Sequence, residues 1–272
     1  MNTKTNEGVA ISTRTEGITL PSYPDLAGKV AVVTGGSGGI GAATCRLLAA
    51  NGAKVVVNGR DGAKIDALVD EIDSAGGQAI GVAADVTDFA AIERMRQRVE
   101  QELGSVEVLA TFAASGPPPG PSARITEEEW RSAIDGSLTS TFLTLKSFLP
   151  AMIERGGGSI VTMASSAGRV LTPAPTAYAA AKAGVVMLSR QVAVEVGEHG
   201  VRVNCPAPDS VLTERTRSYM TEDQVRRWAA GFPLGRMGTP EDVALATLFL
   251  ASESSSWLTG VTLDVAGGKI ML

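Results

Sequence analysis

The 272-residue sequence is poor in the side chains on which many active sites depend. It contains one histidine, His199, and two cysteines, Cys45 and Cys205. Two cysteines are too few for a disulfide framework, and a single imidazole leaves little to activate a thiol or bind a metal. We interpret both cysteines as small core residues and His199, in "GEHGVRVN", as a solvated turn residue. No metal site is predicted.

The sequence also lacks an excess of positive charge and any long apolar run. Its formal net charge is −5, which argues against nucleic acid as a partner because phosphate binding needs a basic surface. There is no polybasic run for an anionic membrane. No window approaches the roughly 18 apolar residues of a membrane span, and the N-terminus shows no apolar signal-peptide stretch. We therefore expect a cytoplasmic protein.

The sequence does contain a regular alternation of strand and helix patterns. Hydrophobic residues make up 44% of the chain, which is enough for a sizeable core. Short β-branched runs predict strands at "KVAVVTG", "AKVVVNGR", "QAIGVAADV", "VEVLATFAA", "GSIVTMAS", "VRVNCPAP" and "VTLDVAG". Helix patterns separate them, the longest at 126–154 and 176–198, with Thr126 as the N-cap of the first.

This alternation predicts a single-domain α/β protein with a Rossmann fold. Its sheet is doubly wound, mostly parallel and seven-stranded, with helices on both faces. Residues 1–27 are polar and are expected to form a flexible arm, and 28–272 form the domain. The proline-rich "GPPPGPS" at 116–122 predicts a loop beside the fourth strand.

A glycine-rich turn, "TGGSGGIG" at 34–41, separates the first strand from the first helix. Gly35 permits a tight turn, Gly39 permits close approach to a pyrophosphate, and Gly41 permits the helix to pack near the strand. The helix N-terminus offers free N–H groups and a positive dipole end to phosphates. The strand–turn–helix setting therefore predicts a dinucleotide site.

The spacing TGxxxGxG resembles that of the classical short-chain dehydrogenase/reductase family, and especially its 3-oxoacyl-carrier-protein reductase-like ketoreductases. The resemblance runs from Lys29 to the C-terminus. It rests on "GKVAVVTGGSGGIG", "ADVTD", "YAAAK", "RVN", "PLGRMGTPEDVA" and "LTGVTLDVAGG". It implies that the cofactor is contacted by Gly35, Ser37, Gly39, Ile40, Gly41, Arg60, Asp85, Val86, Ala113, Tyr178, Lys182, Pro208, Val211 and Thr213.

The end of the second strand bears on which nucleotide is bound. Rossmann sites that prefer NAD carry a carboxylate there, which accepts from the ribose 2′-hydroxyl and repels a 2′-phosphate. This sequence has Gly59 and then Arg60, and an arginine fork suits a phosphate. Asp61, the next residue, weakens the pattern. The sequence favours NADP(H) over NAD(H).

"YAAAK" places Tyr178 and Lys182 four residues apart, so they share a face of a helix. A free phenol has a pKa of about 10, and a neighbouring ammonium is expected to lower it. The pair can then exchange a proton with a carbonyl or alcohol oxygen. By resemblance, Ser165 binds the substrate oxygen, with Ser166 as the neighbouring candidate, and Lys182 also holds the nicotinamide ribose.

Three positions depart from the family pattern. The usual "NNAG" after the fourth strand is Thr111-Phe112-Ala113-Ala114, and the helix asparagine that helps hold a water chain to the lysine is Ser137. Asp209 follows Pro208 where glycine is usual. Either these are drift in an active reductase, which the intact Ser165, Tyr178 and Lys182 favour, or the site is retuned. If Ser137 is a weakened relay residue, Ser137→Asn should raise turnover.

The segment 209–232 corresponds to the substrate lid of the family. Its apolar residues either line a pocket or pack between helices; they are Tyr219, Met220, Trp228 and Phe232. We expect a fairly apolar small-molecule carbonyl substrate, free rather than carrier-bound, because few basic residues flank the site. The resemblance implies a homotetramer, or a homodimer, assembled through the two long helices and the last strand.

These observations predict an NADP-dependent oxidoreductase that interconverts a ketone and a secondary alcohol by hydride transfer. Two alternatives remain open. One is a non-redox member of the family, such as an isomerase, dehydratase or cyclase. The other is a nucleotide-binding regulatory protein.

Overall fold

The computed structural model describes residues 21–116 and 120–272. Most of the expected arm lies outside this range, but its last residues do not. Pro24–Leu26 form a short 3-10 helix, and the side chain of Leu26 is fully buried in the core. The backbone N–H of Tyr23 donates to Asn51 Oδ1 over 2.7 Å. The last residues of the expected arm therefore pack against the domain, because the buried apolar side chain of Leu26 anchors them.

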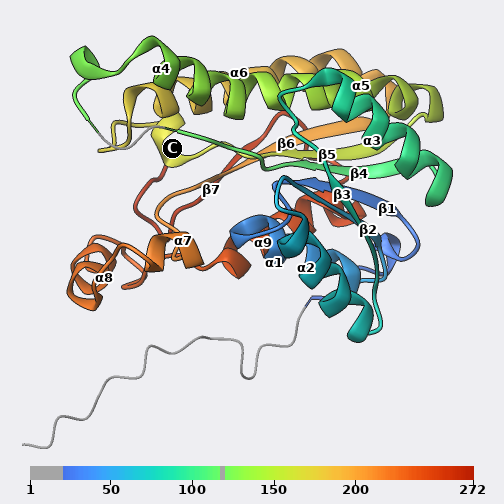
Figure 1. Ribbon diagram of the computed structural model, residues 1–272, viewed down its shortest axis with the longest axis horizontal. Helices are drawn as coiled ribbons and strands as arrows, with labels where there is room; N and C mark the ends of the chain where they lie inside the picture. The colour runs from blue at the N-terminus through green and yellow to red at the C-terminus, as the bar shows by residue number, and fades with distance from the viewer. Residues whose placement is uncertain (1–20, 117–119) are drawn as a thin grey trace, which may run out of the picture.

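Seven parallel strands form the sheet, in the order β3-β2-β1-β4-β5-β6-β7 (Figure 1). They are β1 Val30–Thr34, β2 Lys54–Gly59, β3 Gln78–Ala83, β4 Val106–Thr111, β5 Gly158–Thr162, β6 Val201–Pro208 and β7 Thr262–Val265. The order reverses between β3-β2-β1 and β4 onward, which is where doubly wound sheets bind ligands at their carboxyl edge. The predicted fold class is confirmed.

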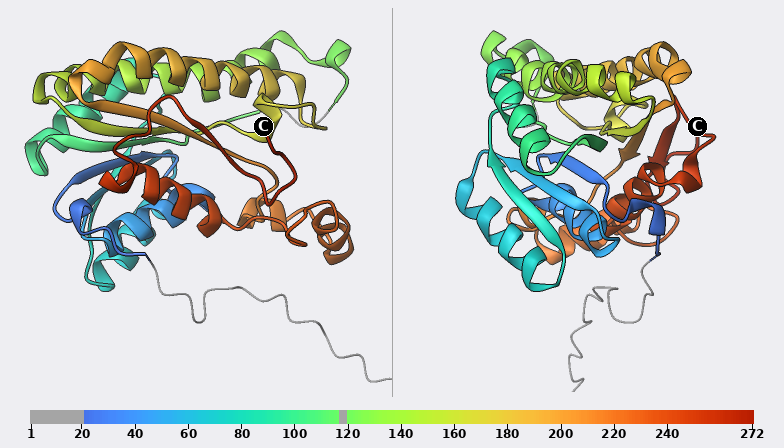
Figure 2. Two further views of the ribbon diagram at one scale, coloured as in Figure 1. Left: turned by 180° about the vertical axis from the view of Figure 1, so that it is seen from behind. Right: turned by 90° about the vertical axis from the view of Figure 1, so that its right-hand side faces the viewer.

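Helices cover both faces of the sheet, as Figure 2 shows from behind and from the side. One apolar core lies under α1 Gly39–Ala50, α2 Gly62–Ser74 and α9 Pro240–Ala251. A second lies under α3 Phe89–Glu102, α5 Ser140–Arg155 and α6 Thr176–Val196. The central strands are mostly apolar because both of their faces are covered.

The long helix predicted at 126–154 is divided. It consists of α4 Glu127–Ile134, a π-helical segment Asp135–Thr139, and α5. Thr126 caps α4 in a capping box with Glu129, as predicted. The π segment contains Ser137. Single π turns inside helices often lie at functional sites.

The segment between β6 and α9 carries two short helices, α7 Glu214–Arg217 and α8 Glu222–Ala229. They project beyond the carboxyl edge of the sheet, next to the chain that follows β7 (Figure 1, left). None of the helices in residues 21–116 and 120–272 combines the length and apolar character needed to cross a lipid bilayer.

Candidate active site

The glycine turn between β1 and α1 is too compact for side chains at its key positions. A methyl group at Gly41 would lie 2.1 Å from the carbonyl oxygen of Gly35, and one at Gly35 would lie 2.9 Å from Ala113 N. Gly35 and Gly39 have φ of 66° and 51°, a region that favours glycine. No side chain caps the N-terminus of α1, so its N–H groups are available to an anion. The turn fits a diphosphate.

The turn opens into a cleft of about 480 Å³ at the carboxyl edge of β1 to β4. The cleft brings together six of the predicted cofactor residues, which are Gly35, Ser37, Arg60, Asp85, Val86 and Ala113. Asp85 accepts hydrogen bonds from Thr87 N and Thr87 Oγ1, and these hold the pKa of its carboxyl group below the ordinary value. The remaining predicted contacts lie around this cleft or on the lid.

Thr213 lies against the glycine turn, since a methyl group at Gly39 would be 3.3 Å from its Cγ2. Val211 forms a β-bridge with Gly238, and Pro208 is the last residue of β6. Ile40 follows Gly39 in the first turn of α1. The first turn of α1 and the start of the lid therefore meet across the glycine turn.

The end of β2 carries no carboxylate toward the cleft. Asn58 is buried, and its amide donates to Val82 O and Ala84 O. A methyl group at Gly59 would lie 2.6 Å from Ser37 Oγ, so this serine stands directly over the strand end. Asp61 is turned away as the N-cap of α2, where it accepts from Lys64 N. Arg60 and Ser37 are thus the polar side chains at this corner.

The predicted catalytic side chains meet where β5 and α6 approach each other. Ser165 follows β5, where its hydroxyl accepts from Ala167 N, and Tyr178 lies in the first turn of α6 with its phenol near Ser165. The Nζ atom of Lys182 lies 5.6 Å from the centre of the Tyr178 ring. A Cβ on Gly116 would be 3.3 Å from the same ring, so the chain after β4 covers Tyr178 closely.

The ionisation of this pair differs from the prediction. Burial raises the pKa of Tyr178, and the hydrogen bond from Ser165 and the charge of Arg215 offset this only in part. Burial lowers the pKa of Lys182 to about 8. Lys182 is buried and donates to Met163 O over 2.8 Å. Desolvation outweighs the lowering expected from Lys182, whose ammonium group points to a carbonyl group.

Among the described residues, the hydroxyl of Ser137 forms its hydrogen bonds with Ser115 and not with Lys182. Its hydroxyl donates to Ser115 O over 3.0 Å and accepts from Ser115 N over 3.3 Å. The Ser115 hydroxyl in turn donates to Ser132 O. Ser137 is fully buried. These bonds join the segment after β4 to the π segment, so Ser137 supports the wall of the cleft. No hydrogen bond among the described residues supports its predicted relay role.

The other departures from the family pattern have different surroundings. Thr111 is buried, and its hydroxyl has no hydrogen-bond partner among the described residues. Phe112 lines the cleft and packs against the core under α1. Asp209 is paired with Lys269 over 3.1 Å and accepts from Ser210 N over 2.7 Å.

The sequence alone did not identify Arg215 or Lys269 as residues of the site. It also did not indicate that Ser166 lies near Asp209. Arg215 lies in α7, and its charge acts on Tyr178. The clustered arginines of the lid, "TERTR", were the only available indication. Lys269 lies 91 residues after Tyr178 in the chain, and no local pattern relates it to the site.

The lid residues divide into two groups. Phe232 is buried in a small core with Leu212 and Met237, against which Met220 packs. Tyr219 and Trp228 are 67% and 42% exposed. Packing therefore explains Phe232 and Met220, and only Tyr219 and Trp228 remain free to meet a ligand.

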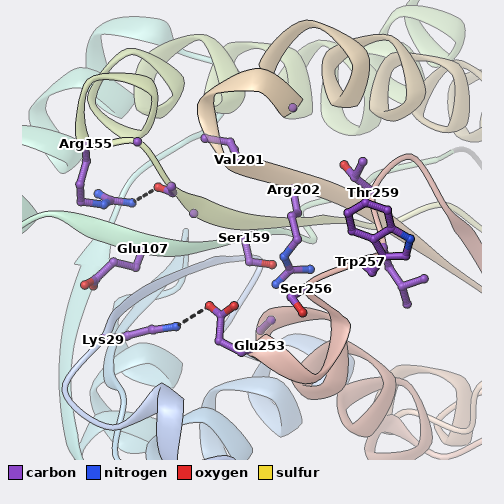
Figure 3. Close-up of a pocket in the computed structure, with 17 residues that line it drawn as sticks. Lys29, Glu107, Arg155, Ser159, Val201, Arg202, Glu253, Ser256, Trp257 and Thr259 are labelled. Carbon is purple, nitrogen blue, oxygen red and sulfur yellow. Dashed lines mark hydrogen bonds and ion pairs between the residues drawn. The ribbon is translucent and has the colours of Figure 1, made fainter.

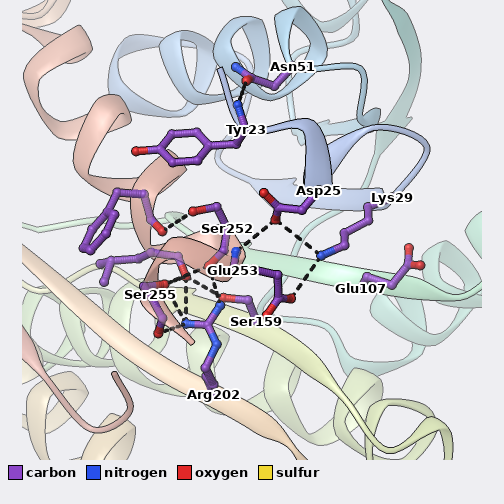
Figure 4. Close-up of polar contacts among 12 residues, drawn as sticks. Tyr23, Asp25, Lys29, Asn51, Glu107, Ser159, Arg202, Ser252, Glu253 and Ser255 are labelled. Atoms are coloured by element: carbon purple, nitrogen blue, oxygen red, sulfur yellow. Dashed lines mark hydrogen bonds and ion pairs between the residues drawn. The ribbon is translucent and has the colours of Figure 1, made fainter. Parts of the chain in front are cut away.

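A second, larger cavity of about 740 Å³ lies at the opposite, amino edge of the sheet (Figure 3). Residues that begin strands line it, including Ser159 and Arg202. Arg202 donates to Leu250 O, Ser252 O and Ser255 O, and Lys29 pairs with Glu253 (Figure 4). Arg202 and Lys29 are therefore already engaged in bonds that stabilise the fold.

Comparisons with known proteins agree with the fold. A family model described as enoyl-(acyl carrier protein) reductase matches residues 35–269. The chain is 38% identical over 244 residues to the 3-oxoacyl-[acyl-carrier-protein] reductase FabG of Chlamydia muridarum, covering 89% of this chain and 98% of the relative. It is 35% identical to the 2,5-dichloro-2,5-cyclohexadiene-1,4-diol dehydrogenase LinX of Sphingobium indicum, covering 89% and 96%.

Among solved structures, one described as a putative short-chain dehydrogenase/reductase from Burkholderia xenovorans superposes with a TM-score of 0.85 at 36% identity. The match covers 91% of this chain and 98% of that one. The chain belongs to the short-chain dehydrogenase/reductase family, in its classical form, a family of oxidoreductases.

Proposed function

We propose that the protein is an NADP(H)-dependent oxidoreductase that interconverts a ketone and a secondary alcohol. The observation that carries this proposal is the group formed by Ser165, Tyr178 and Lys182 at the carboxyl edge of the sheet, beside a glycine turn that fits a diphosphate. A bound nicotinamide nucleotide would supply or accept the hydride. The glycine turn, Asp85 and Val86 would hold its adenine half, and Lys182 would hold its nicotinamide ribose.

The chain's own groups divide the remaining work. In reduction, the protonated phenol of Tyr178 donates its proton to the carbonyl oxygen, and Ser165 orients that oxygen by a hydrogen bond. The raised pKa keeps Tyr178 protonated at neutral pH, which suits an acid. In the reverse direction the phenolate must form, and the nearby charges of Lys182 and Arg215 favour it.

The preference for NADP(H) rests on Ser37 and Arg60. Both residues line the cleft at the end of β2, where Asp61 is turned away as the N-cap of α2 and Asp85 accepts from Thr87. A guanidinium and a hydroxyl can both donate to phosphate oxygens.

For the substrate, we favour a free apolar ketone or alcohol of small or medium size. Relatives of this chain are named for carrier-bound 3-oxoacyl groups. Here Val194, where that subgroup often has arginine, is 80% exposed, and Arg155 lies at the amino edge of the sheet and donates to Gly157 O. Neither offers a cation near Tyr178 for a carrier protein.

A homotetramer, or a homodimer, is the assembly that we propose. The apolar side chains of Phe142, Met187 and Val194 are between 48% and 80% exposed on α5 and α6, and β7 is an edge strand. Such exposed apolar side chains are unusual for a monomer's surface when they cluster. Light scattering after gel filtration would measure the mass.

A panel of ketones and alcohols assayed with both nucleotides tests the activity. We expect substrate-dependent change at the reduced-nicotinamide absorbance, and its loss in Tyr178→Phe. Tyr23→Phe, a change beside the short 3-10 helix Pro24–Leu26 and outside the cleft, is the matched control. Product formation without absorbance change would instead indicate a non-redox member, and nucleotide binding without product a regulatory protein.

A further inference from the structure

Lys269, in the segment after β7, contacts three parts of the chain that are distant in sequence. Its Nζ atom lies 3.1 Å from Asp209 Oδ1. It also lies 4.7 Å from the ring centre of Phe232 and 5.3 Å from that of Trp228. A cation over aromatic rings is attracted by their negative faces. One ammonium group therefore links the end of β6, the lid and the C-terminal segment.

The other end of this contact reaches the residue next to the catalytic serine. The Asp209 side chain is 5% exposed and accepts from Ser210 N over 2.7 Å as well as from Lys269. Burial raises the pKa of this carboxyl group, but Ser166, the neighbour of Ser165, and the other partners more than offset that rise. A buried carboxylate is stable only when such partners compensate its lost hydration. Lys269 thus supplies the counter-charge that an aspartate at this position requires.

Backbone contacts fix Lys269 in this place. The N–H of Leu234, at the end of the lid, donates to Gly267 O over 3.1 Å. A methyl group at Gly268 would lie 2.9 Å from Pro233, and Gly267 and Gly268 have φ of 56° and 83°. Only glycine allows the chain to cross the lid so closely in this conformation. The segment that carries Lys269 is therefore held against the lid before its side chain makes any contact.

A second ion pair joins the same two regions. Arg169 ends the turn that begins at Ser165, and its guanidinium pairs with Asp264 of β7 over 2.8 Å. Both side chains are nearly buried, at 10% and 12% exposure. The C-terminal segment thus supports the serine turn through Asp264, and Lys269 adds a contact with the end of β6 and with the lid.

From these contacts we infer that Lys269 is a positioning residue, which holds Asp209 at the end of β6 and keeps the lid over the site. Its effect on kinetics rests on the proposed function. Loss of its charge releases the lid aromatics and leaves Asp209 with an uncompensated carboxylate. Substrate binding then weakens more than the chemical step does, because Lys269 touches none of the reacting groups.

The test compares Lys269→Met, which keeps the length of the side chain, with Lys269→Arg, which keeps its charge. We expect Lys269→Met to raise KM for the ketone about tenfold while kcat changes less than about threefold. Lys269→Arg should restore most of the affinity. Lys54→Met, on the far side of the sheet, removes the same charge as a control and should behave as the wild type.

A second measurement does not depend on activity. The lid contains tryptic sites at Arg215, Arg217, Arg226 and Arg227. Limited trypsin digestion should cut the lid faster in Lys269→Met than in the wild type, Lys269→Arg or Lys54→Met. If the protein reduced no ketone, the proposed function would fail while this digestion still tested the contact.

The pairing of Lys269 with Asp209 is tested by a double-mutant cycle. Asp209→Asn alone should also raise KM and speed digestion, and adding Lys269→Met should have less effect than in the wild-type background. Unchanged digestion and KM in Lys269→Met, or strict additivity of the two substitutions, would overturn the inference.

Discussion

The two edges of the sheet both hold buried or half-buried cations, but the cations differ in how they are satisfied. At the amino edge, Arg202 donates to three carbonyl groups, and the cavity beside it is the larger of the two. At the carboxyl edge, Lys182 has one carbonyl acceptor, and burial lowers its pKa to about 8. Cavity size therefore does not locate the chemistry. The proposed chemistry lies instead beside Lys182, a charge with one carbonyl acceptor that stands next to the phenol of Tyr178 and the hydroxyl of Ser165.

The largest effect is expected at Lys182. Lys182→Met should lower kcat by about 10²–10⁴-fold, because the charge that favours the phenolate and the contact with the cofactor are both lost. The same change should stabilise the protein. The pKa of Lys182 is about 8 in the folded chain and 10.5 ordinarily, so folding disfavours its charged form, and this cost is fully present below pH 8.

Chemical denaturation of Lys182→Met and the wild type at several pH values measures this cost. We expect the variant to be more stable by roughly 1–3 kcal/mol at pH 7. The difference should shrink as the pH rises from about 8 toward 10.5, where the wild-type lysine loses its charge in the unfolded chain as well. An equal or lower stability of the variant at pH 7 would contradict the inference that burial of the charged Lys182 destabilises the folded protein.

Arg202 provides the opposite case. Arg202→Leu should reduce the free energy of unfolding by about 2–4 kcal/mol, since the carbonyl groups of Leu250, Ser252 and Ser255 lose their donor. The activity per folded molecule should stay unchanged. Arg155→Gln, in the same cavity, removes one exposed contact and should cost under about 1 kcal/mol. Loss of activity in folded Arg202→Leu would show that the two edges are coupled.

Arg60 tests how the cleft selects its nucleotide. Arg60→Leu should lower the preference for NADPH over NADH by about 10–100-fold, because a charge-assisted hydrogen bond to the 2′-phosphate is lost. The KM for NADH should hardly change. Arg94→Leu, at an exposed position on α3, is the control. A uniform loss of affinity for both nucleotides would mean that Arg60 only shapes the cleft.

Among the residues at the carboxyl edge, substitution of Ser137 is expected to give the smallest change in kinetics. Because both hydrogen bonds of its hydroxyl go to the backbone of Ser115, Ser137→Asn should leave kcat within about threefold and destabilise the buried site by about 1–2 kcal/mol. Ser137→Ala should cost a similar amount by removing both bonds. A clear rise in kcat for Ser137→Asn would restore the relay role that the sequence suggested.

Local sequence signals predicted much of the structure. The glycine turn, the capping box at Thr126 and the alternation of strands and helices follow from residues close together in the chain. The π segment at Ser137, the burial of Leu26 and the direction of the Tyr178 pKa did not follow. Each depends on how deeply a side chain is covered by elements that sequence patterns do not place.

The amino-acid sequence by itself determined the alternation of strands and helices, the glycine turn and the spacing of Tyr178 and Lys182, because each arises from backbone geometry over a few residues. The tertiary structure decided which charges are compensated. Desolvation, and the pairing of Lys269 with Asp209 across 60 residues, exist only once distant segments pack together.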